Sequence, residues 1–262
     1  MQSDNKIKNF YKKNGYYILS NFLSNQEVKK ISNKLNKIKL IQKKVKRGLS
    51  EPGVNTSLLF NLHKDNLLKK IIEENKNFKK ILKNLLNDEY KIWNAKSNLK
   101  SRWHGSAEYY HQDFAYWREY GFKSTEMLSC MIFVDDHKHL NGGLWIFPGT
   151  HKKFYKHKKF ININSLQKNL IPIETLDKLE KKQKAISLNS KAGSCIFFHC
   201  KLIHGSSHNI SSKNRRIILY QISTSKEYDE KLITKINIQN VKKRKKFEKN
   251  QLLKRLNKIN EN

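Results

Sequence analysis

His111 and Asp113 stand two residues apart in the stretch YYHQDFAYW, residues 109–117. Residues i and i+2 of a β-strand point to the same face, so a strand here would project an imidazole and a carboxylate side by side. These two groups can share one divalent ion, although H-x-D alone is a common pattern. The pair therefore indicates a metal site only if a third ligand comes from elsewhere in the chain.

A second stretch, residues 197–215, contains three histidines, His199, His204 and His208. Gly205 and Ser206 interrupt helical spacing here and no cysteine pair is present, which disfavours a local zinc site. Two histidines and one carboxylate instead form the facial triad typical of non-haem Fe(II) in oxygenases, which leaves positions for an anionic cosubstrate and dioxygen. An arginine would hold the cosubstrate's far carboxylate, and Arg215 or Arg216 is available on the next strand.

Short runs rich in aromatic and β-branched residues dominate the chain from about residue 90. They are YKIWN, MLSCMIFVDD, GLWIFPG, SCIFFHC and RRIILYQIS. No helical pattern separates most of them, so we expect an antiparallel sandwich or jelly roll rather than a parallel α/β sheet. The Asn141-Gly142 step between two of the runs predicts a tight hairpin.

Two helical patterns precede these strands. The stretch LSNQEVKKISNKLNKIKLI begins with Ser24 and has Glu27 three residues later, which is a capping-box signature. Residues 66–86 repeat apolar residues at helical spacing. Both helices are expected to pack against the sheets. His137, His139, His151 and His157 lie in polar loops and are expected at the surface.

The charge of the chain is strongly positive, at +32, and the sequence pI is near 10. Such a balance raises the hypothesis of nucleic-acid binding. Only seven of the 54 basic residues are arginine, however, and lysine is scattered along the whole chain. This pattern favours a solvated lysine surface over a dedicated polyanion site, while the charge still favours an anionic substrate.

The sequence also predicts the domain limits and the cellular location. The 262 residues fit one domain over 1–240, with 151–190 as a lid or insertion and 241–262 as a basic tail or helix. Three cysteines without a C-x-x-C pair indicate a reducing, cytoplasmic setting. No apolar run reaches the ~20 residues needed to cross a bilayer, and the first residues lack a signal peptide's apolar segment. The sequence says nothing about oligomeric state.

Four segments together carry a family resemblance. FYKKNGYYILSNFLSNQEV is similar to a glycine-centred strand followed by a helix, and YHQDFAYW resembles an H-x-D-F-x-x-W segment. NGGLWIFPGTH matches N-G-x-L…P-G-[ST]-H, and HGSSHNISSKNR fits H-x-S-x-x-N-x-S-x-x-x-R. From about residue 8 to 225 the chain thereby resembles the phytanoyl-CoA dioxygenase family of Fe(II)- and 2-oxoglutarate-dependent oxygenases, particularly its ectoine hydroxylase branch.

This resemblance implies roles for individual residues. The iron ligands would be His111, Asp113 and His204. Arg215, rather than Arg216, would hold the distal carboxylate of 2-oxoglutarate. Further cosubstrate contacts are implied for Asn98, Ser129 and Ser206. Trp117 would wall the substrate cavity, and Asn94, where the ectoine hydroxylase branch has glutamine, would alter the substrate contacts.

The resemblance also implies the fold and the reaction. The fold would be a double-stranded β-helix, mainly β, with flanking helices on one sheet. Fe(II), 2-oxoglutarate and O2 would serve to hydroxylate a small organic substrate, with oxidative decarboxylation of 2-oxoglutarate to succinate and CO2. Two alternatives stay open. A cupin-like metal-binding module would not need Arg215, and a basic nucleic-acid-binding protein would bind duplexes with steep salt dependence.

Overall fold

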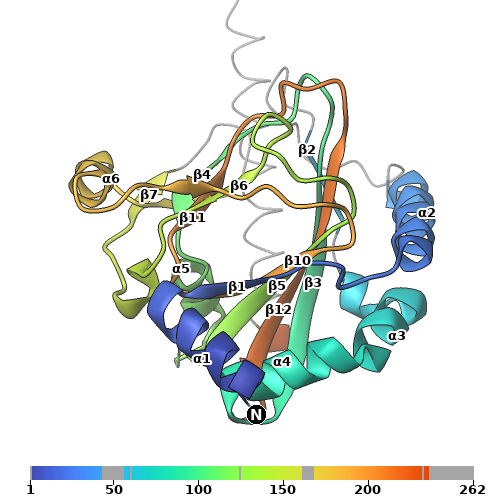
Figure 1. Ribbon diagram of the computed structural model, residues 1–262, viewed down its shortest axis with the longest axis horizontal. Helices are drawn as coiled ribbons and strands as arrows, with labels where there is room; N and C mark the ends of the chain where they lie inside the picture. Colours follow the sequence, from blue (N-terminus) through green and yellow to red (C-terminus); the bar gives the residue numbers. More distant parts are fainter. Residues whose placement is uncertain are drawn as a thin grey trace, which may run out of the picture.

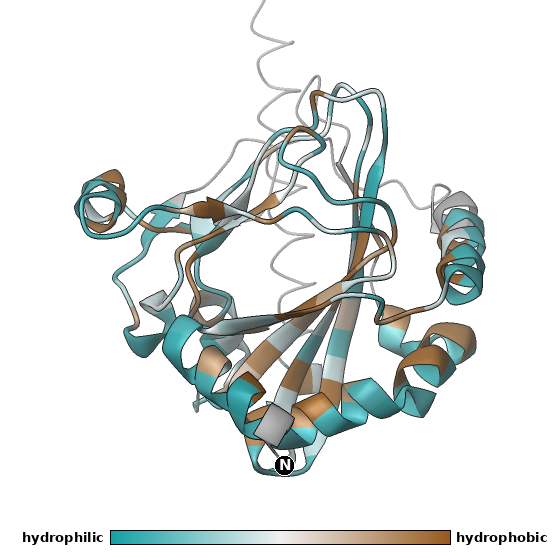
Figure 2. Ribbon diagram, viewed as in Figure 1, coloured by the Kyte–Doolittle hydropathy of each residue, from teal (hydrophilic) through white to brown (hydrophobic). Residues whose placement is uncertain are grey.

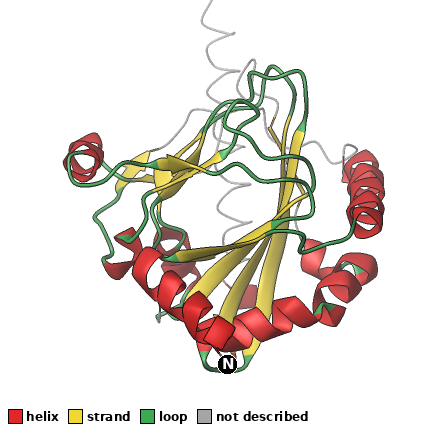
Figure 3. Ribbon diagram, in the orientation of Figure 1, coloured by secondary structure: helices red, strands yellow, loops and turns green. Residues whose placement is uncertain are grey.

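The computed structural model describes residues 2–42, 56–59, 61–123, 125–160, 168–231 and 233–235 of the 262-residue chain. Two antiparallel sheets, one of six strands and one of four, form the body of the protein, and most helices lie outside the larger sheet (Figure 1, Figure 3). This arrangement is the jelly roll with flanking helices that the sequence predicts.

The six-stranded sheet is the larger of the two sheets. Its order is β1 (Tyr16–Leu19), β10 (Cys195–His199), β5 (Met127–Phe133), β12 (Arg215–Thr224), β3 (Tyr90–Lys100) and β2 (Thr56–Leu59). Strands β12 and β3 pair from Arg215 opposite Lys100 to Thr224 opposite Tyr90, with a register shift at Gln221. Strand β5 is buried at every position, which explains a sequence that is apolar except for Ser129.

The four-stranded sheet has the order β4 (Glu108–His111), β11 (His204–Ser206), β6 (Leu144–Ile146) and β9 (Ile186–Ser187). His204 of β11 lies opposite His111 of β4. A separate pair of strands, β7 (Lys158–Phe160) and β8 (Lys168–Leu170), precedes helix α6 (Ile173–Glu180). The small sheet therefore brings two histidines from distant parts of the chain into direct register.

Helices cover the outer face of the large sheet. They are α1 (Gln2–Asn14), α2 (Asn25–Gln42), α3 (Asn66–Glu74) and α4 (Lys76–Leu86). A single turn, α5 (Phe114–Trp117), follows β4. Short 3-10 turns are η1 (Leu62–Lys64), η2 (Arg118–Tyr120), η3 (Thr150–Lys152) and η4 (Ser225–Glu227). None of the helices within the described ranges is long and apolar enough to span a membrane.

Apolar side chains form two layers about the large sheet. The outer layer joins helix residues such as Leu68, Phe78 and Leu82 to the outward side chains of the sheet, and the inner layer joins Met131 and Leu219 to the small sheet. Figure 2 shows hydrophobic residues concentrated on the central strands and hydrophilic ones on the outward sides of the helices. Successive residues of a strand alternate between the layers, so sequence position decides which side chains face the interior.

The predicted helices are present, with one difference. In the capping box, the Ser24 amide donates to Glu27 Oε2 at 2.8 Å and the Glu27 amide donates to Ser24 Oγ at 3.3 Å. The helical pattern over 66–86 is divided at Asn75, whose extended backbone ends α3 and whose side chain accepts from the Phe78 amide at 2.9 Å to begin α4. Asparagine is a favoured N-cap, which accounts for the break.

Two expectations about loops are wrong. The Asn141-Gly142 step does not form a hairpin, because the flanking strands β5 and β6 belong to different sheets. Gly142 is needed for another reason: its φ is +91°, and a Cβ there would lie 2.5 Å from Lys100 Cδ. Among the histidines expected at the surface, His137 and His151 are buried, at 1% and 8% exposure.

Residues 151–190 are described except for 161–167, and they contain η3, β7, β8, α6 and β9. Their function as a lid stays a prediction. Residues 241–262, for which a basic tail or helix was predicted, lie outside the described residues.

Candidate metal centre

The predicted ligands His111 and Asp113 lie at a bend of the chain and not along one strand face. Strand β4 ends at His111, and Asp113 already has helical backbone angles, φ −55° and ψ −35°, at the start of α5. Backbone amides of Tyr116 and Trp117 donate to the Asp113 carbonyl, which closes this helical turn. The expectation of a common strand face is therefore wrong, although the bend still brings the two side chains together.

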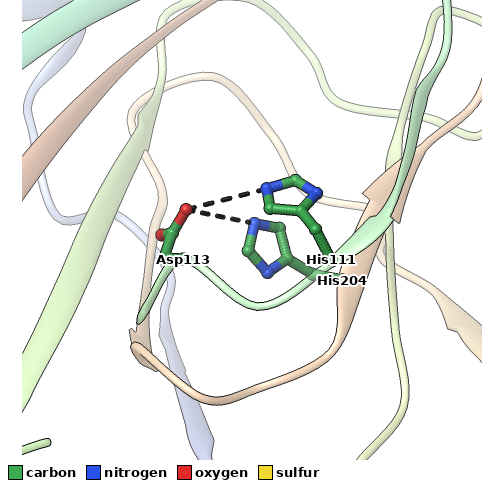
Figure 4. A group of neighbouring side chains, drawn as sticks. All are labelled: His111, Asp113 and His204. Atoms are coloured by element: carbon green, nitrogen blue, oxygen red, sulfur yellow. Dashed lines mark ion pairs between the residues drawn. The ribbon is translucent and has the colours of Figure 1, made fainter. Parts of the chain in front are cut away.

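Three potential ligands converge at this bend (Figure 4). Asp113 Oδ1 lies 3.7 Å from His111 Nε2 and 3.8 Å from His204 Nε2. All three ligand atoms lie within 4.8 Å of one another. Asp113 and His204 are 4% and 5% exposed. Two imidazoles and one carboxylate match the donor set that non-haem Fe(II) takes in oxygenases, so the residues fit this ion.

Contacts with local backbone carbonyls fix the tautomer of both histidines. His111 Nδ1 lies 2.8 Å from the Tyr109 carbonyl, and His204 Nδ1 lies 3.0 Å from the Leu202 carbonyl. A carbonyl can only accept, so Nδ1 carries the proton in each ring and Nε2 keeps its lone pair. Both lone pairs are therefore available for a metal, with the tautomer set by the chain itself.

The carboxylate is oriented by Ser129, whose Oγ donates to Asp113 Oδ2 at 2.8 Å. This contact leaves Oδ1 facing the two imidazoles. Burial alone would raise the pKa of Asp113, but His204, His111 and Lys96 outweigh it and hold this pKa below its ordinary value. Burial, followed by the neighbouring His111, lowers the pKa of His204 to about 4. At neutral pH the site therefore holds a carboxylate and an uncharged His204 ring.

Cationic and polar groups occupy the interior near the end of β3 and the start of β12. Arg215 is 3% exposed and Lys100, opposite it, is fully buried. Lys100 Nζ donates to Ser206 Oγ at 2.7 Å and to the Ser207 carbonyl at 2.5 Å. Asn98 is one alternation away on β3, and its Oδ1 has no hydrogen-bond partner within the described ranges.

The two neighbouring arginines have different surroundings. Burial lowers the pKa of Arg215 to about 10, against the raising effect of Glu108 and Asp135, so its guanidinium stays charged at neutral pH. Its Nε has no hydrogen-bond partner in the described part of the chain. Arg216 instead bonds Asp135 through Nε at 2.8 Å and Nη2 at 2.6 Å, and donates to Ser32 Oγ. Of the two guanidinium groups, that of Arg215 retains hydrogen-bonding capacity for a carboxylate.

Asn94 and Trp117, which were predicted to contact the substrate, lie apart from the Lys100 and Arg215 pair. Asn94 Nδ2 donates to Gln221 Oε1 at 2.7 Å. Trp117 is 1% exposed and packs edge-on against Trp93, with ring centroids 5.5 Å apart. This places Trp117 within an aromatic cluster that also contains Phe114 and Phe122, and its contact with substrate stays a prediction.

Three further residues at the site were not identified from the sequence: Lys96, Gln112 and His137. Lys96 had a readable signal, because Asn94, Lys96, Asn98 and Lys100 alternate with Ala95, Ser97 and Leu99 along β3. Polar residues at every second position of a buried strand indicate a polar interior face. Gln112 and His137 had no comparable signal, since their roles depend on contacts with distant segments.

A jelly roll that holds two histidines, an aspartate and a buried arginine in its interior defines the class of Fe(II)- and 2-oxoglutarate-dependent oxygenases. The family model described as Phytanoyl-CoA dioxygenase (PhyH) matches residues 11–217. The chain belongs to this family.

Individual relatives agree with this membership. An ectoine dioxygenase of Bordetella bronchiseptica is 29% identical over 216 residues, covering 77% of this chain and 69% of the relative. An L-proline trans-4-hydroxylase of Streptomyces griseoviridis is 28% identical over 147 residues, covering 52% and 55%. In fold, the chain is similar to EctD from S. alaskensis with 2-oxoglutarate and 5-hydroxyectoine, with TM-score 0.73, 22% identity, and coverage of 86% of this chain and 77% of that chain.

The chain is thus an enzyme, an Fe(II)- and 2-oxoglutarate-dependent dioxygenase that hydroxylates a small organic substrate. Its cofactor is Fe(II), and 2-oxoglutarate and O2 are consumed with the substrate. These similarities give no support to the nucleic-acid-binding alternative.

Proposed function

We propose that this dioxygenase acts on a small substrate bearing a negative charge, with His111, Asp113 and His204 holding Fe(II) and Arg215 holding the distal carboxylate of 2-oxoglutarate. Bound Fe(II) supplies the activation of dioxygen that couples decarboxylation of 2-oxoglutarate to hydroxylation of the substrate. The protein's part is to orient both organic molecules, to provide counter-charges and to exclude water.

The register of β3 and β12 supports this division of the interior. The side chains that face inward, taken from one end, are Lys100 with Arg215, Asn98 with Ile217, Lys96 with Leu219, and Asn94 with Gln221. The step from Lys100 to Lys96 spans four residues, or roughly 13 Å of strand. The cationic pair thus lies at one end and Lys96 lies closer to the ligands, since it contributes to the lowered pKa of both Asp113 and His204. We assign the first zone to the cosubstrate and the zone around Lys96 and Asn94 to the substrate.

The negative charge that we propose for the substrate rests on Lys96. It is half-buried on the interior face, and it makes no hydrogen bond or ion pair with any described residue. An ammonium group in this position has donors available for an anionic group of the substrate. The names of two relatives refer to ectoine and L-proline, and both compounds carry a carboxylate. We therefore infer a small carboxylate of the amino-acid type, contacted differently from ectoine because Asn94 replaces glutamine.

The cysteines support a cytoplasmic location. Cys130, Cys195 and Cys200 are all unpaired and buried, as expected for a protein kept in a reducing compartment.

A succinate-coupled screen of small metabolites tests the proposal. Anionic candidates should be turned over and their uncharged amides or esters should not. With the best substrate, Lys96→Met should raise its KM by about 10- to 100-fold, as expected for loss of one charge-assisted hydrogen bond. The Kd for 2-oxoglutarate should change much less, and Lys96→Arg should restore part of the loss.

Lys91→Met is the matched control, because Lys91 is an exposed lysine on the same strand. Its KM should equal that of the unmodified enzyme. An uncharged substrate turned over as efficiently as the carboxylate, or an unchanged KM in Lys96→Met, would show that the substrate charge is assigned wrongly.

A further inference from the structure

The buried polar atoms that lack hydrogen-bond partners among the described residues include Arg215 Nε, Asn98 Oδ1 and His137 Nδ1. Arg215 and Asn98 already belong to the proposed cosubstrate zone. His137 is 1% exposed and is close enough to Arg215 and Lys100 for both cations to act on it. Native proteins rarely leave a buried donor unpaired, so an unpaired donor beside two cations points to an anionic ligand.

The protonation of His137 follows from its other contacts. Its ring stacks on Phe133, with centroids 4.3 Å apart and planes inclined by 20°. The Leu144 amide donates to His137 Nε2 at 2.7 Å. An amide can only donate, so Nε2 is the unprotonated nitrogen and Nδ1 carries the hydrogen. His137 is therefore a neutral ring with one free N–H donor, and burial together with Arg215 and Lys100 keeps its pKa well below the ordinary value.

The turn that carries His137 also holds Lys100. Asn141 stabilises this turn, since its Oδ1 accepts from the Lys138 amide at 2.9 Å and its Nδ2 donates to the Asp136 carbonyl at 2.7 Å. Gly142, in the same turn, packs so closely on the Lys100 side chain that no Cβ would fit. One rigid turn thus positions the neutral donor and the stem of the buried ammonium together.

We propose that His137 binds the distal carboxylate of 2-oxoglutarate as a third donor beside Arg215 and the Lys100–Ser206 pair. A carboxylate offers about four lone-pair sites on two oxygens, so it can accept from all of these groups. Ser206 contributes because its hydroxyl accepts from Lys100 and keeps its own proton to donate. Since Glu108 and Asp135 also act on Arg215, a neutral donor adds hydrogen bonding where charge alone is partly offset.

This inference rests on the proposed role of Arg215 in cosubstrate binding. The test is the equilibrium Kd of 2-oxoglutarate, measured by titration calorimetry without oxygen on the Mn²⁺-loaded protein. 2-Oxopentanoate serves as the comparison ligand, because it retains the metal-chelating end and lacks the distal carboxylate. His137→Phe keeps a flat ring against Phe133 and removes the donor. This variant should raise the Kd of 2-oxoglutarate by about tenfold and leave the Kd of 2-oxopentanoate unchanged.

Two further variants complete the experiment. His137→Gln can accept from Leu144 and donate a hydrogen bond, so it should recover part of the 2-oxoglutarate affinity. His139→Gln, at an exposed position in the same turn, should bind both ligands as the unmodified protein does.

The outcomes separate the two assignments. If His137→Phe raised the Kd of both ligands equally, the role of His137 would be structural only. If it changed neither Kd, His137 would have no role in the site. If Arg215→Leu weakens 2-oxoglutarate while His137→Phe does not, only the inference about His137 fails. If Arg215→Leu also leaves 2-oxoglutarate binding unchanged, the proposed cosubstrate zone itself is wrong.

Discussion

The strands of the six-stranded sheet are four to eleven residues long, whereas those of the four-stranded sheet are two to four residues long. The large sheet is held by apolar side chains on both faces, including a layer of helices. Yet the small sheet carries His111 and His204, two of the three proposed metal ligands. Two of the proposed ligands thus lie on the sheet with the shorter strands, while the residues proposed for 2-oxoglutarate lie on the larger sheet.

Side chains that bond to backbone groups compensate for these short strands. Gln112 Nε2 donates to the Lys153 and Lys201 carbonyls, and its Oε1 accepts from the Tyr155 amide. Thr150 Oγ1 accepts from the Ile203 amide at 3.0 Å, just before His204. Such bonds fix positions to a fraction of an ångström, while apolar packing supplies most of the stability. Substitutions at the metal centre and in the outer layer of the large sheet should therefore separate metal binding from stability.

The largest effect is expected from Asp113→Ala in the metal centre. With Fe(II) and 2-oxoglutarate under anaerobic conditions, the unmodified protein should give a weak visible charge-transfer band. The variant should lose this band and all succinate formation, because one of three ligands is gone. Its thermal unfolding should stay cooperative, since the packing of the large sheet is untouched.

Asp177→Ala provides the control for this experiment, because Asp177 is an exposed carboxylate on α6. It should retain the band at full strength. An undiminished band in Asp113→Ala would show that the ligands are assigned wrongly.

Phe78→Ala should produce the opposite separation. Phe78 of α4 is fully buried and contacts Phe22, Tyr90 and Phe197, with ring centroids 6.0–6.3 Å apart. The cavity should lower the free energy of unfolding by about 3–5 kcal/mol. Chemical denaturation measures this change, and the Kd for 2-oxoglutarate in the folded protein should stay the same. A weakened Kd would mean that the outer layer of the large sheet is energetically coupled to its inner face, which carries Arg215 and Lys100.

The smallest expected effect is that of Gln112→Met, which keeps the side-chain volume and leaves three backbone groups without their partner. The free energy of unfolding should fall by about 1–3 kcal/mol. Metal affinity should fall by about tenfold, because Gln112 joins the two ligands of the turn to the segment over 153–155. Competition with a chelator measures the affinity. Loss of stability without loss of affinity would mean that the turn keeps its shape without these bonds.

Elements with a strong local pattern were predictable from the sequence, and those decided by distant contacts were not. Strands β5, β10 and β12 of the large sheet follow from apolar runs, and the Ser24–Glu27 cap from its spacing. His137 lies in a polar stretch but is buried, because Leu144 and Phe133 enclose it. No local pattern contains that information.

The convergence of the proposed ligands was predicted for a partly wrong reason. His111 and Asp113 do converge, yet through the bend into α5 and not through strand alternation. The spacing of two residues was informative because both conformations bring the side chains within reach of one ion. Which conformation is adopted depends on bonds from outside the stretch, such as the Phe114 amide to the Cys200 carbonyl at 2.9 Å.

The bonds between each ligand histidine and the carbonyl two residues before it have a kinetic consequence. They are formed by the chain alone, so the imidazoles need not reorient when an ion arrives or leaves. An iron centre that has been damaged by oxidation could then be exchanged for a fresh ion within the folded protein. Reloading the site would then require no refolding of the polypeptide.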